Sequence, residues 1–215
     1  MRPAAILFDC DGVLVDSEPI TDRVLAANLA RHGLTLPAHE IGSMFLGGTI
    51  AGLGEEARRL GATLPATWID DVYAEIFAVL AEGTPLIPGI PALLDTLDRA
   101  RIPYAVGSNG PHAKMDVTLG QHPEIHARLV GRIFSRHDVG RPKPAPDLYL
   151  HAANALGAAP ETCVVVEDSP TGARAAQAAG MTCFGFAPNG DGARLAAVGA
   201  RPFRHMDELP ALLGL

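Results

Sequence analysis

The sequence predicts an α/β protein in which helices cover both faces of a parallel β-sheet, with a block of helices inserted after the first strand. Two observations support this prediction. Short, continuously apolar runs alternate with helical patterns, as is typical of parallel strands that are covered on both faces. One long segment carries helical patterns only, which breaks the alternation and indicates a second, helical unit.

Four segments have the character of buried strands, because each is apolar at consecutive positions and ends in small or polar residues. They are AAILFD at 4–9, YAVGSNG at 104–110, TCVVVEDS at 162–169 and MTCFGFAP at 181–188. Helical patterns occupy residues 91–102, 145–158, 171–180 and 191–199, and Gly180 and Gly199 are placed as C-terminal caps. The alternation predicts a doubly wound sheet, which binds its ligands at the carboxyl ends of the strands.

The helical block is predicted to be a domain of its own. Residues 17–82 contain the helical patterns PITDRVLAANLARHG and ATWIDDVYAEIFAVLAEG and no convincing strand, and TPLIPG at 84–89 is typical of a return linker. We therefore expect an α/β core domain of residues 1–16 and 83–215 and a helical domain of residues 17–82. The helical block carries four arginines and nine acidic residues, so it holds −5 of the formal net charge of −7.

Composition limits the classes of function. A chain of 215 residues that is 48% hydrophobic can bury one sizeable core, and a net charge of −7 argues against a nucleic-acid partner. No apolar run is long enough to span a bilayer. Cys10, Cys163 and Cys183 lie inside apolar runs, which indicates buried reduced thiols. We expect a soluble cytoplasmic protein without a membrane partner, as a monomer or weak dimer.

Two aspartates close the first predicted strand. Asp9 and Asp11 lie where an α/β sheet presents its ligands, and Gly12 allows a tight turn directly after them. A carboxylate in that position can attack as a nucleophile while a second acid handles the proton of the leaving group. The alternative is an acidic junction between a strand and a turn.

Three later strand ends carry groups that such a site would need. Ser108 and Asn109 offer a hydroxyl and an amide beside a helix that Pro111 begins, whose free N–H groups can hold an anion; the alternative is an ordinary helix cap. Lys143 lies between two prolines in a chain that has 15 arginines and only two lysines. A compact point charge would explain that choice, whereas a solvated loop lysine is the alternative.

The fourth strand end is VVVEDSPTG, in which Glu167 and Asp168 follow a run of valines. Two acids next to Asp9 and Asp11 would crowd like charges unless a cation lies among them. Carboxylate oxygens beside a phosphate suit Mg²⁺. Asp168 or Ser169 could instead only cap the following helix, but four such strand ends together are hard to explain as turns.

These elements, in this order, resemble the haloacid dehalogenase superfamily of phosphotransferases over nearly the whole chain. The matching segments are DCDGVLVDSE, SNG, Lys143 in RPKP, and EDS. The resemblance implies a Rossmann-like core with a small helical cap domain after the first motif. It also implies catalysis by Asp9, Asp11, Ser108 and Lys143, with Asp9 as the nucleophile and Asp11 as the general acid and base.

The same resemblance implies a Mg²⁺ cofactor and a small phosphate ester as the partner. Its metal ligands would be Asp9, the main-chain carbonyl of Asp11, and Asp168, with Glu167 as a helper. Its substrate contacts would come from Ser108, Asn109, Lys143, Gly47 and Gly48. Asp11 favours phosphoryl transfer over dehalogenation, because an alkoxide needs a proton on leaving and a halide does not.

Within the family, the chain resembles two subgroups of capped enzymes. SNGPHAKM, and EPI after DS, are similar to the 6-phosphogluconate phosphatase subgroup, although Leu46 and Ile50 replace basic residues of its cap loop. The second subgroup is β-phosphoglucomutase, in which a histidine and an arginine stand where this chain has Thr21 and Ile50. Lys114 and His112 are candidates for contacting a substrate or the cap, or for a solvated helix face.

The sequence therefore predicts a Mg²⁺-dependent phosphatase that hydrolyses small phosphate monoesters, such as phosphosugars or sugar-acid phosphates including 6-phosphogluconate, through an aspartyl-phosphate intermediate. A phosphosugar mutase of the β-phosphoglucomutase type is the first alternative. The second is a binding protein that kept the scaffold without catalysis, although no catalytic position is lost.

Overall fold

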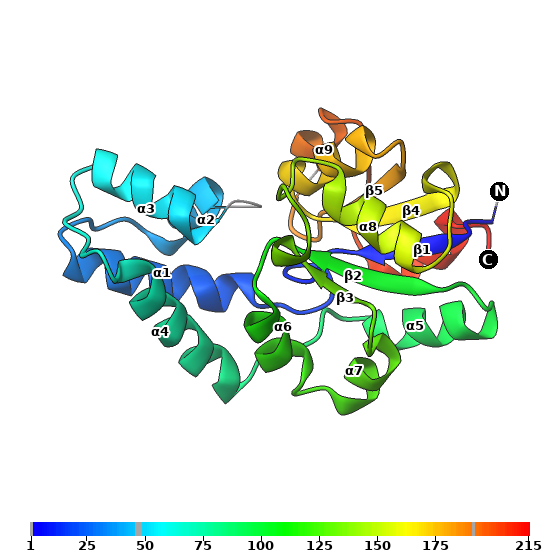
Figure 1. Ribbon diagram of the computed structural model, residues 1–215, viewed down its shortest axis with the longest axis horizontal. Helices are drawn as coiled ribbons and strands as arrows, with labels where there is room; N and C mark the ends of the chain where they lie inside the picture. The colour runs from blue at the N-terminus through cyan, green and yellow to red at the C-terminus, as the bar shows by residue number, and fades with distance from the viewer. Residues whose placement is uncertain (1, 46–48, 191) are drawn as a thin grey trace.

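The computed structural model describes residues 2–45, 49–190 and 192–215. Figure 1 shows two lobes, one built around a β-sheet and one made of helices. Both chain ends lie on the sheet lobe, at the side that faces away from the helical lobe.

The sheet has six strands in the order β3-β2-β1-β4-β5-β6, and every neighbouring pair is parallel. The strands are β1 Ala5–Phe8, β2 Tyr104–Ser108, β3 Ile133–Ser135, β4 Cys163–Glu167, β5 Thr182–Phe186 and β6 Arg201–Phe203. The predicted fold class is confirmed, and β1, β2, β4 and β5 correspond to the four predicted strands. The sequence analysis missed β3 and β6, because three residues are too few to show a period.

Helices cover both faces of the sheet, which explains why its strands are apolar at every position. Ile6 and Phe8 of β1 belong to one buried cluster, which includes residues of α5, α6 and α7, whereas Ala5 and Leu7 belong to another with residues of α8 and α9. The helices of this lobe are α5 Ile90–Arg99, α6 His112–Leu119, α7 Pro123–Leu129, α8 Asp147–Ala155, α9 Pro170–Ala178, α10 Ala193–Ala196 and α11 Leu209–Leu212. Gly180 and Gly199 follow α9 and α10 with φ values of 73° and 81°, as expected for helix ends.

The helical lobe has a hydrophobic cluster of its own. Its helices are α1 Glu18–Arg31, α2 Ala38–Phe45, α3 Ile50–Arg59 and α4 Trp68–Glu82. Trp68 is fully buried in this cluster with Leu25 and Leu29, and its indole Nε1 donates to Asn28 Oδ1 at 2.7 Å. A Cβ added at Gly54 would lie 2.7 Å from the Trp68 ring, so glycine allows α3 to approach it.

Two chain segments connect the lobes, and they pair with each other. The main-chain nitrogen of Asp16 donates to Pro85 O at 2.8 Å, and that of Ile87 donates to Leu14 O at 2.9 Å. Gln121 of α6 adds a side-chain link, because it donates to Leu80 O and accepts from Thr84 N, both at 2.9 Å. These contacts lie next to the boundaries that the sequence predicts at residues 16–17 and 82–83.

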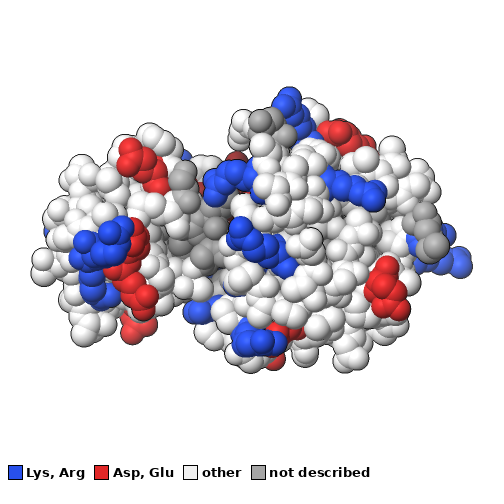
Figure 2. All heavy atoms as spheres, turned by 90° about the horizontal axis from the view of Figure 1, so that it is seen from above, with Lys and Arg blue, Asp and Glu red and all other residues white. Residues whose placement is uncertain are grey.

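The cysteines are buried, as their apolar surroundings predict. On the face that Figure 2 shows, lysines and arginines are spread over both lobes, and those of the helical lobe lie against acidic side chains. All three cysteines are buried and free of disulfides. In the ranges that the structure describes, no helix is long and apolar enough to cross a membrane.

Candidate active site

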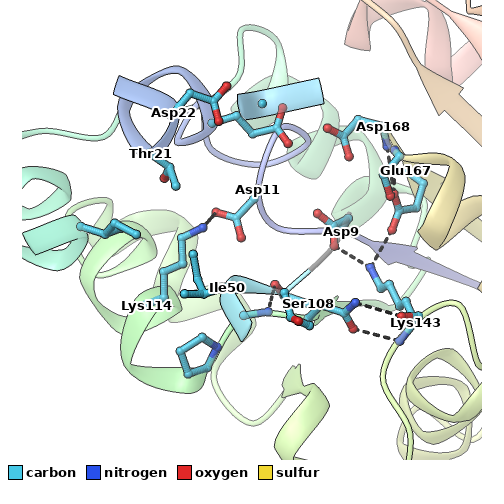
Figure 3. Close-up of a pocket in the computed structure, with 18 of the residues that line it drawn as sticks. Asp9, Asp11, Thr21, Asp22, Ile50, Ser108, Lys114, Lys143, Glu167 and Asp168 are labelled. Carbon is cyan, nitrogen blue, oxygen red and sulfur yellow. Dashed lines mark hydrogen bonds and ion pairs between the residues drawn. The ribbon is translucent and has the colours of Figure 1, made fainter. Parts of the chain in front are cut away.

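Three neighbouring strands end at one cleft of about 340 Å³ between the lobes. The ends of β1, β2 and β4 place Asp9, Ser108 and Glu167 on its wall, and Lys143 reaches it from the segment before α8. Figure 3 shows Asp9, Lys143, Glu167 and Asp168 close together, with Asp11 between this group and Lys114. The structure thus brings together the predicted residues of all four motifs, but Lys143 lies in the loop between β3 and α8 and not at the end of a strand as predicted.

Lys143 is the centre of a buried ion cluster. Its Nζ lies 2.5 Å from Asp9 Oδ1 and 2.6 Å from Glu167 Oε1, and the residue is only 5% exposed. Although burial alone would lower it, the pKa of Lys143 is raised by these two carboxylates. Asn109 holds the main chain of Lys143 from both sides, accepting from its N at 2.9 Å and donating to its O at 3.2 Å. The ammonium is therefore held in place and charged.

Glu167 supports this cluster from behind. Its Oε1 also accepts from the Tyr149 hydroxyl at 2.8 Å, and its Oε2 accepts from the nitrogen and the hydroxyl of Ser169 at 3.0 and 2.9 Å. Burial would raise the pKa of Glu167, but Lys143 and these donors lower it. A Cβ at Gly172 would lie 1.6 Å from Oε1, so a glycine is needed there. Both oxygens of Glu167 already accept hydrogen bonds. The carboxylate is therefore placed to hold the ammonium of Lys143 in position.

Asp9 and Asp11 lie in different electrostatic surroundings. Burial raises the pKa of Asp9 to about 7 even though Lys143 acts to lower it. Burial would also raise the pKa of Asp11, but Lys114, whose Nζ is 2.7 Å from Asp11 Oδ1, and the Ser17 hydroxyl hold it below its usual range. Two carboxylates with pKa values pushed apart are typical of a site that divides its roles between them.

Asp168 closes the cleft beside the turn after β1. A Cβ at Gly12, whose φ is 75°, would lie 2.2 Å from Asp168 Oδ2, so this turn requires glycine. Burial, with the negative charges of Glu18, Glu167 and Asp9, raises the pKa of Asp168 well above its usual value. A cation between Asp9 and Asp168 would relieve this crowding.

The donor set fits a hard divalent cation. Across the described residues, no group of three or more His, Cys, Asp or Glu side chains is spaced to hold a metal ion. A site made of Asp9, Asp168 and the main-chain carbonyl of Asp11 needs only two side chains, and Mg²⁺ commonly takes one or two carboxylates with its other positions left to water and phosphate.

Ser108 and the start of α6 form the remaining wall of the cleft. Ser108 Oγ accepts from Gly110 N at 2.9 Å, and Gly110 O accepts from Ser135 Oγ at 2.7 Å. The loop before α6 is therefore ordered by its own hydrogen bonds, and Ser108, Asn109 and Gly110 all line the cleft.

The other predicted positions divide into three cases. Lys114, Thr21 and Ile50 line the cleft, whereas His112 pairs with Asp138 at 2.8 Å on the exposed surface. Gly47 and Gly48, predicted to contact the substrate, and Leu46 lie outside the described residues.

Sequence reasoning missed several residues of the site. Tyr149 gave no signal because it lies in an apolar helical pattern that equally describes a core residue. Ser17 and Glu18 end the first motif, and Asp22 follows it on α1. Only the structure shows that Glu18 and Asp22 line the cleft and that the Ser17 hydroxyl donates to Asp11.

Comparison with known proteins shows which proteins this chain is similar to. A family model described as haloacid dehalogenase-like hydrolase matches residues 3–180. The chain is 34% identical over 213 residues to 6-phosphogluconate phosphatase of Escherichia coli K12, covering 98% of this chain and 95% of that protein. It is 37% identical over 182 residues to hexitol phosphatase A of the same organism, covering 84% and 81%.

A solved structure has the same fold over nearly the whole chain. A hydrolase of this type from Deinococcus radiodurans R1, crystallised with bound phosphate and sodium, matches with a TM-score of 0.81 and 36% identity. The match covers 99% of this chain and 96% of that one. That hydrolase, which is 36% identical to this chain, therefore binds phosphate and a sodium ion.

Proposed function

The chain belongs to the haloacid dehalogenase-like hydrolase family, and from this premise we propose that it is a Mg²⁺-dependent phosphatase of small phosphate monoesters, with phosphosugars and related polyol phosphates as its substrate class. The observation that carries the proposal is the cluster in which Lys143 joins Asp9 to Glu167 at the floor of the cleft. In this proposal Asp9 is the nucleophile, and the fixed positive charge beside it supports that role, because a phosphoryl group needs such a charge on transfer. The helical lobe, residues 17–82, would act as the cap that covers the cleft.

We assign the first step to Asp9 and Asp11. One oxygen of Asp9 attacks phosphorus in line, so that a P–O bond forms to Asp9 as the bond to the leaving oxygen breaks. That oxygen takes the electron pair and receives a proton from Asp11. Asp11 is ionised in the free structure because of Lys114, and an anionic phosphate beside it would raise its pKa and favour the protonated form.

In the second step Asp11 takes a proton from water, and the water oxygen attacks the phosphorus of the aspartyl phosphate. The acyl P–O bond breaks, which regenerates Asp9 and releases phosphate. Lys143 and the Ser108 hydroxyl hold the equatorial oxygens as charge shifts. A divalent cation bound by Asp9, Asp168 and the carbonyl of Asp11 would neutralise negative charge on the phosphoryl group.

The test of the proposed function is phosphate release from a panel of esters with Mg²⁺ and after its removal by a chelator. The panel contains p-nitrophenyl phosphate, hexose phosphates, hexitol phosphates, 6-phosphogluconate and β-glucose 1-phosphate. We expect release that stops on chelation and returns when Mg²⁺ is added. Isomerisation of β-glucose 1-phosphate with a bisphosphate activator, in place of release, would instead identify a mutase, and no turnover of any ester would leave only a binding protein.

Substitution of Asp11 by Asn should separate the two steps. With p-nitrophenyl phosphate the leaving group needs no proton, so formation of the aspartyl phosphate continues while its hydrolysis slows. We expect steady-state turnover to fall by about 10²- to 10⁴-fold, with a burst of one nitrophenolate per active site. Rapid-mixing absorbance measures both. An Asp11→Asn enzyme whose turnover stays near the wild-type rate would contradict the role given to Asp11.

A further inference from the structure

The helical lobe presents to the cleft a polar atom that lacks a partner. Thr21 lines the cleft and is 3% exposed, and within the described part of the chain its Oγ1 makes no hydrogen bond. A buried hydroxyl without a partner lowers stability, and this one is placed to bond to a molecule in the cleft. In Figure 3 Thr21 lies across Asp11 from Lys143, on the side where the leaving group would lie.

Two carboxylates accompany Thr21 on the same helix. Glu18 and Asp22 of α1 both line the cleft. Asp22 is packed against the main chain of α2, because a Cβ at Gly42 would lie 2.2 Å from its Oδ2. Burial raises the pKa of Asp22 to about 6, although Lys114 and Arg23 act to lower it. This carboxylate is therefore held in place and partly removed from water.

Both lysines of the cleft are already paired with carboxylates of the sheet lobe. Lys114 is paired with Asp11 at 2.7 Å, and its charge also acts on Glu18 and Asp22. Lys143 is bound by Asp9 and Glu167. The other lysine or arginine among the described residues of the lining is Arg194, which is exposed and lies on α10 of the sheet lobe. Burial, with the negative charges of Asp11 and Asp22, raises the pKa of Glu18 to about 7. Above that pH both carboxylates of α1 are ionised, and this wall has an excess of negative charge.

We propose that Thr21, Asp22 and Glu18 form a subsite that binds the hydroxyl groups of an uncharged, polyol-like leaving group and disfavours a leaving group that carries a carboxylate. The inference rests on the phosphatase function proposed above and narrows its substrate class. Hydroxyls can donate to the two carboxylates and bond to Thr21 Oγ1, whereas a substrate carboxylate could only repel them. Sugar-acid phosphates such as 6-phosphogluconate are then poorer ligands than hexitol phosphates.

Two ligands that differ at one carbon provide the test. Glucitol 6-phosphate carries a hydroxymethyl group where 6-phosphogluconate carries a carboxylate. Their Kd values can be measured by titration calorimetry on the Asp9→Asn protein with Mg²⁺, where turnover does not interfere. We expect glucitol 6-phosphate to bind at least about tenfold more tightly. Equal affinity, tighter binding of the acid, or no binding of either ligand at millimolar concentration would overturn the subsite.

Substitutions in the same background locate the effect. Asp22→Asn should narrow the ratio of the two Kd values by about fivefold or more, chiefly through tighter binding of the acid. Thr21→Val keeps the side-chain shape but loses the hydroxyl. It should raise the Kd of glucitol 6-phosphate by about three- to tenfold. Asp70→Asn and Thr35→Val are matched controls at exposed positions of the helical lobe. If Asp70→Asn shifted the ratio as much as Asp22→Asn, overall charge would explain it and the subsite would be refuted.

The binding measurement and the turnover measurement test the subsite and the phosphatase function independently of each other. Phosphate release by the wild-type enzyme from the ester panel tests whether the protein is a phosphatase. The Kd ratio tests the subsite even if no ester is hydrolysed. Fast release with a preference for 6-phosphogluconate would keep the proposed function and refute the subsite.

Discussion

Replacing Asp9 by Asn is expected to lower kcat for every phosphate ester by at least about 10⁴-fold, because an amide cannot form the acyl phosphate. The overall fold should remain. Lys143 keeps Glu167 as a partner at 2.6 Å, and burial disfavours the charge of Asp9, whose pKa is raised to about 7. The melting temperature without metal should therefore equal or exceed that of the wild type, as is common where a functional charge is buried.

Three measurements check this expectation. Phosphate release with Mg²⁺ reports activity, thermal unfolding followed by circular dichroism reports stability, and Asp116→Asn, at an exposed position of α6, serves as the matched control. Asp116→Asn should retain activity and stability. Turnover by Asp9→Asn within about tenfold of the wild type would remove Asp9 from the role of nucleophile.

Replacing Lys143 by Met should affect both activity and stability. Loss of the ammonium removes the cation nearest the nucleophile, and the removal of one preorganised charge from such a site costs about 10²- to 10³-fold in kcat. It also leaves Asp9 and Glu167 buried without their common partner, so the free energy of unfolding should fall by about 3 kcal/mol. Lys143→Arg should not restore activity, because a planar guanidinium cannot place one compact point charge between Asp9 and Glu167 as the ammonium does.

The control for Lys143 is Arg141→Met, two residues away. Arg141 pairs with Asp147 at 2.9 Å, but its side chain is 70% exposed, so its loss should change the free energy of unfolding by at most about 0.5 kcal/mol. Urea unfolding measures both variants. A Lys143→Met protein as stable and as active as Arg141→Met would show that the buried ion cluster is not needed.

Much of the fold could be predicted because its strands are buried on both faces. A continuous apolar run such as that of β4, Cys163–Glu167, predicts a buried strand from local residues alone. The edge strands β3 and β6 did not carry it, because their three residues show neither a period nor continuous burial. The loop that carries Lys143 has no regular pattern. Its role could be predicted only together with the other motifs.

The sequence by itself determined which chemistry the protein can perform. In a parallel sheet, polar residues directly after neighbouring strands must converge at one edge, so Asp9, Ser108 and Glu167 could be placed at one site from their positions alone. The order of the four motifs then identified the family.

The tertiary structure alone decided the electrostatic surroundings of these residues. The pairing of Lys114 with Asp11, the support of Glu167 by Tyr149, and the unpartnered hydroxyl of Thr21 each depend on contacts between different elements of the chain. No local pattern encodes such contacts. Burial sets the pKa values and desolvates the charges, and burial exists only in the folded chain.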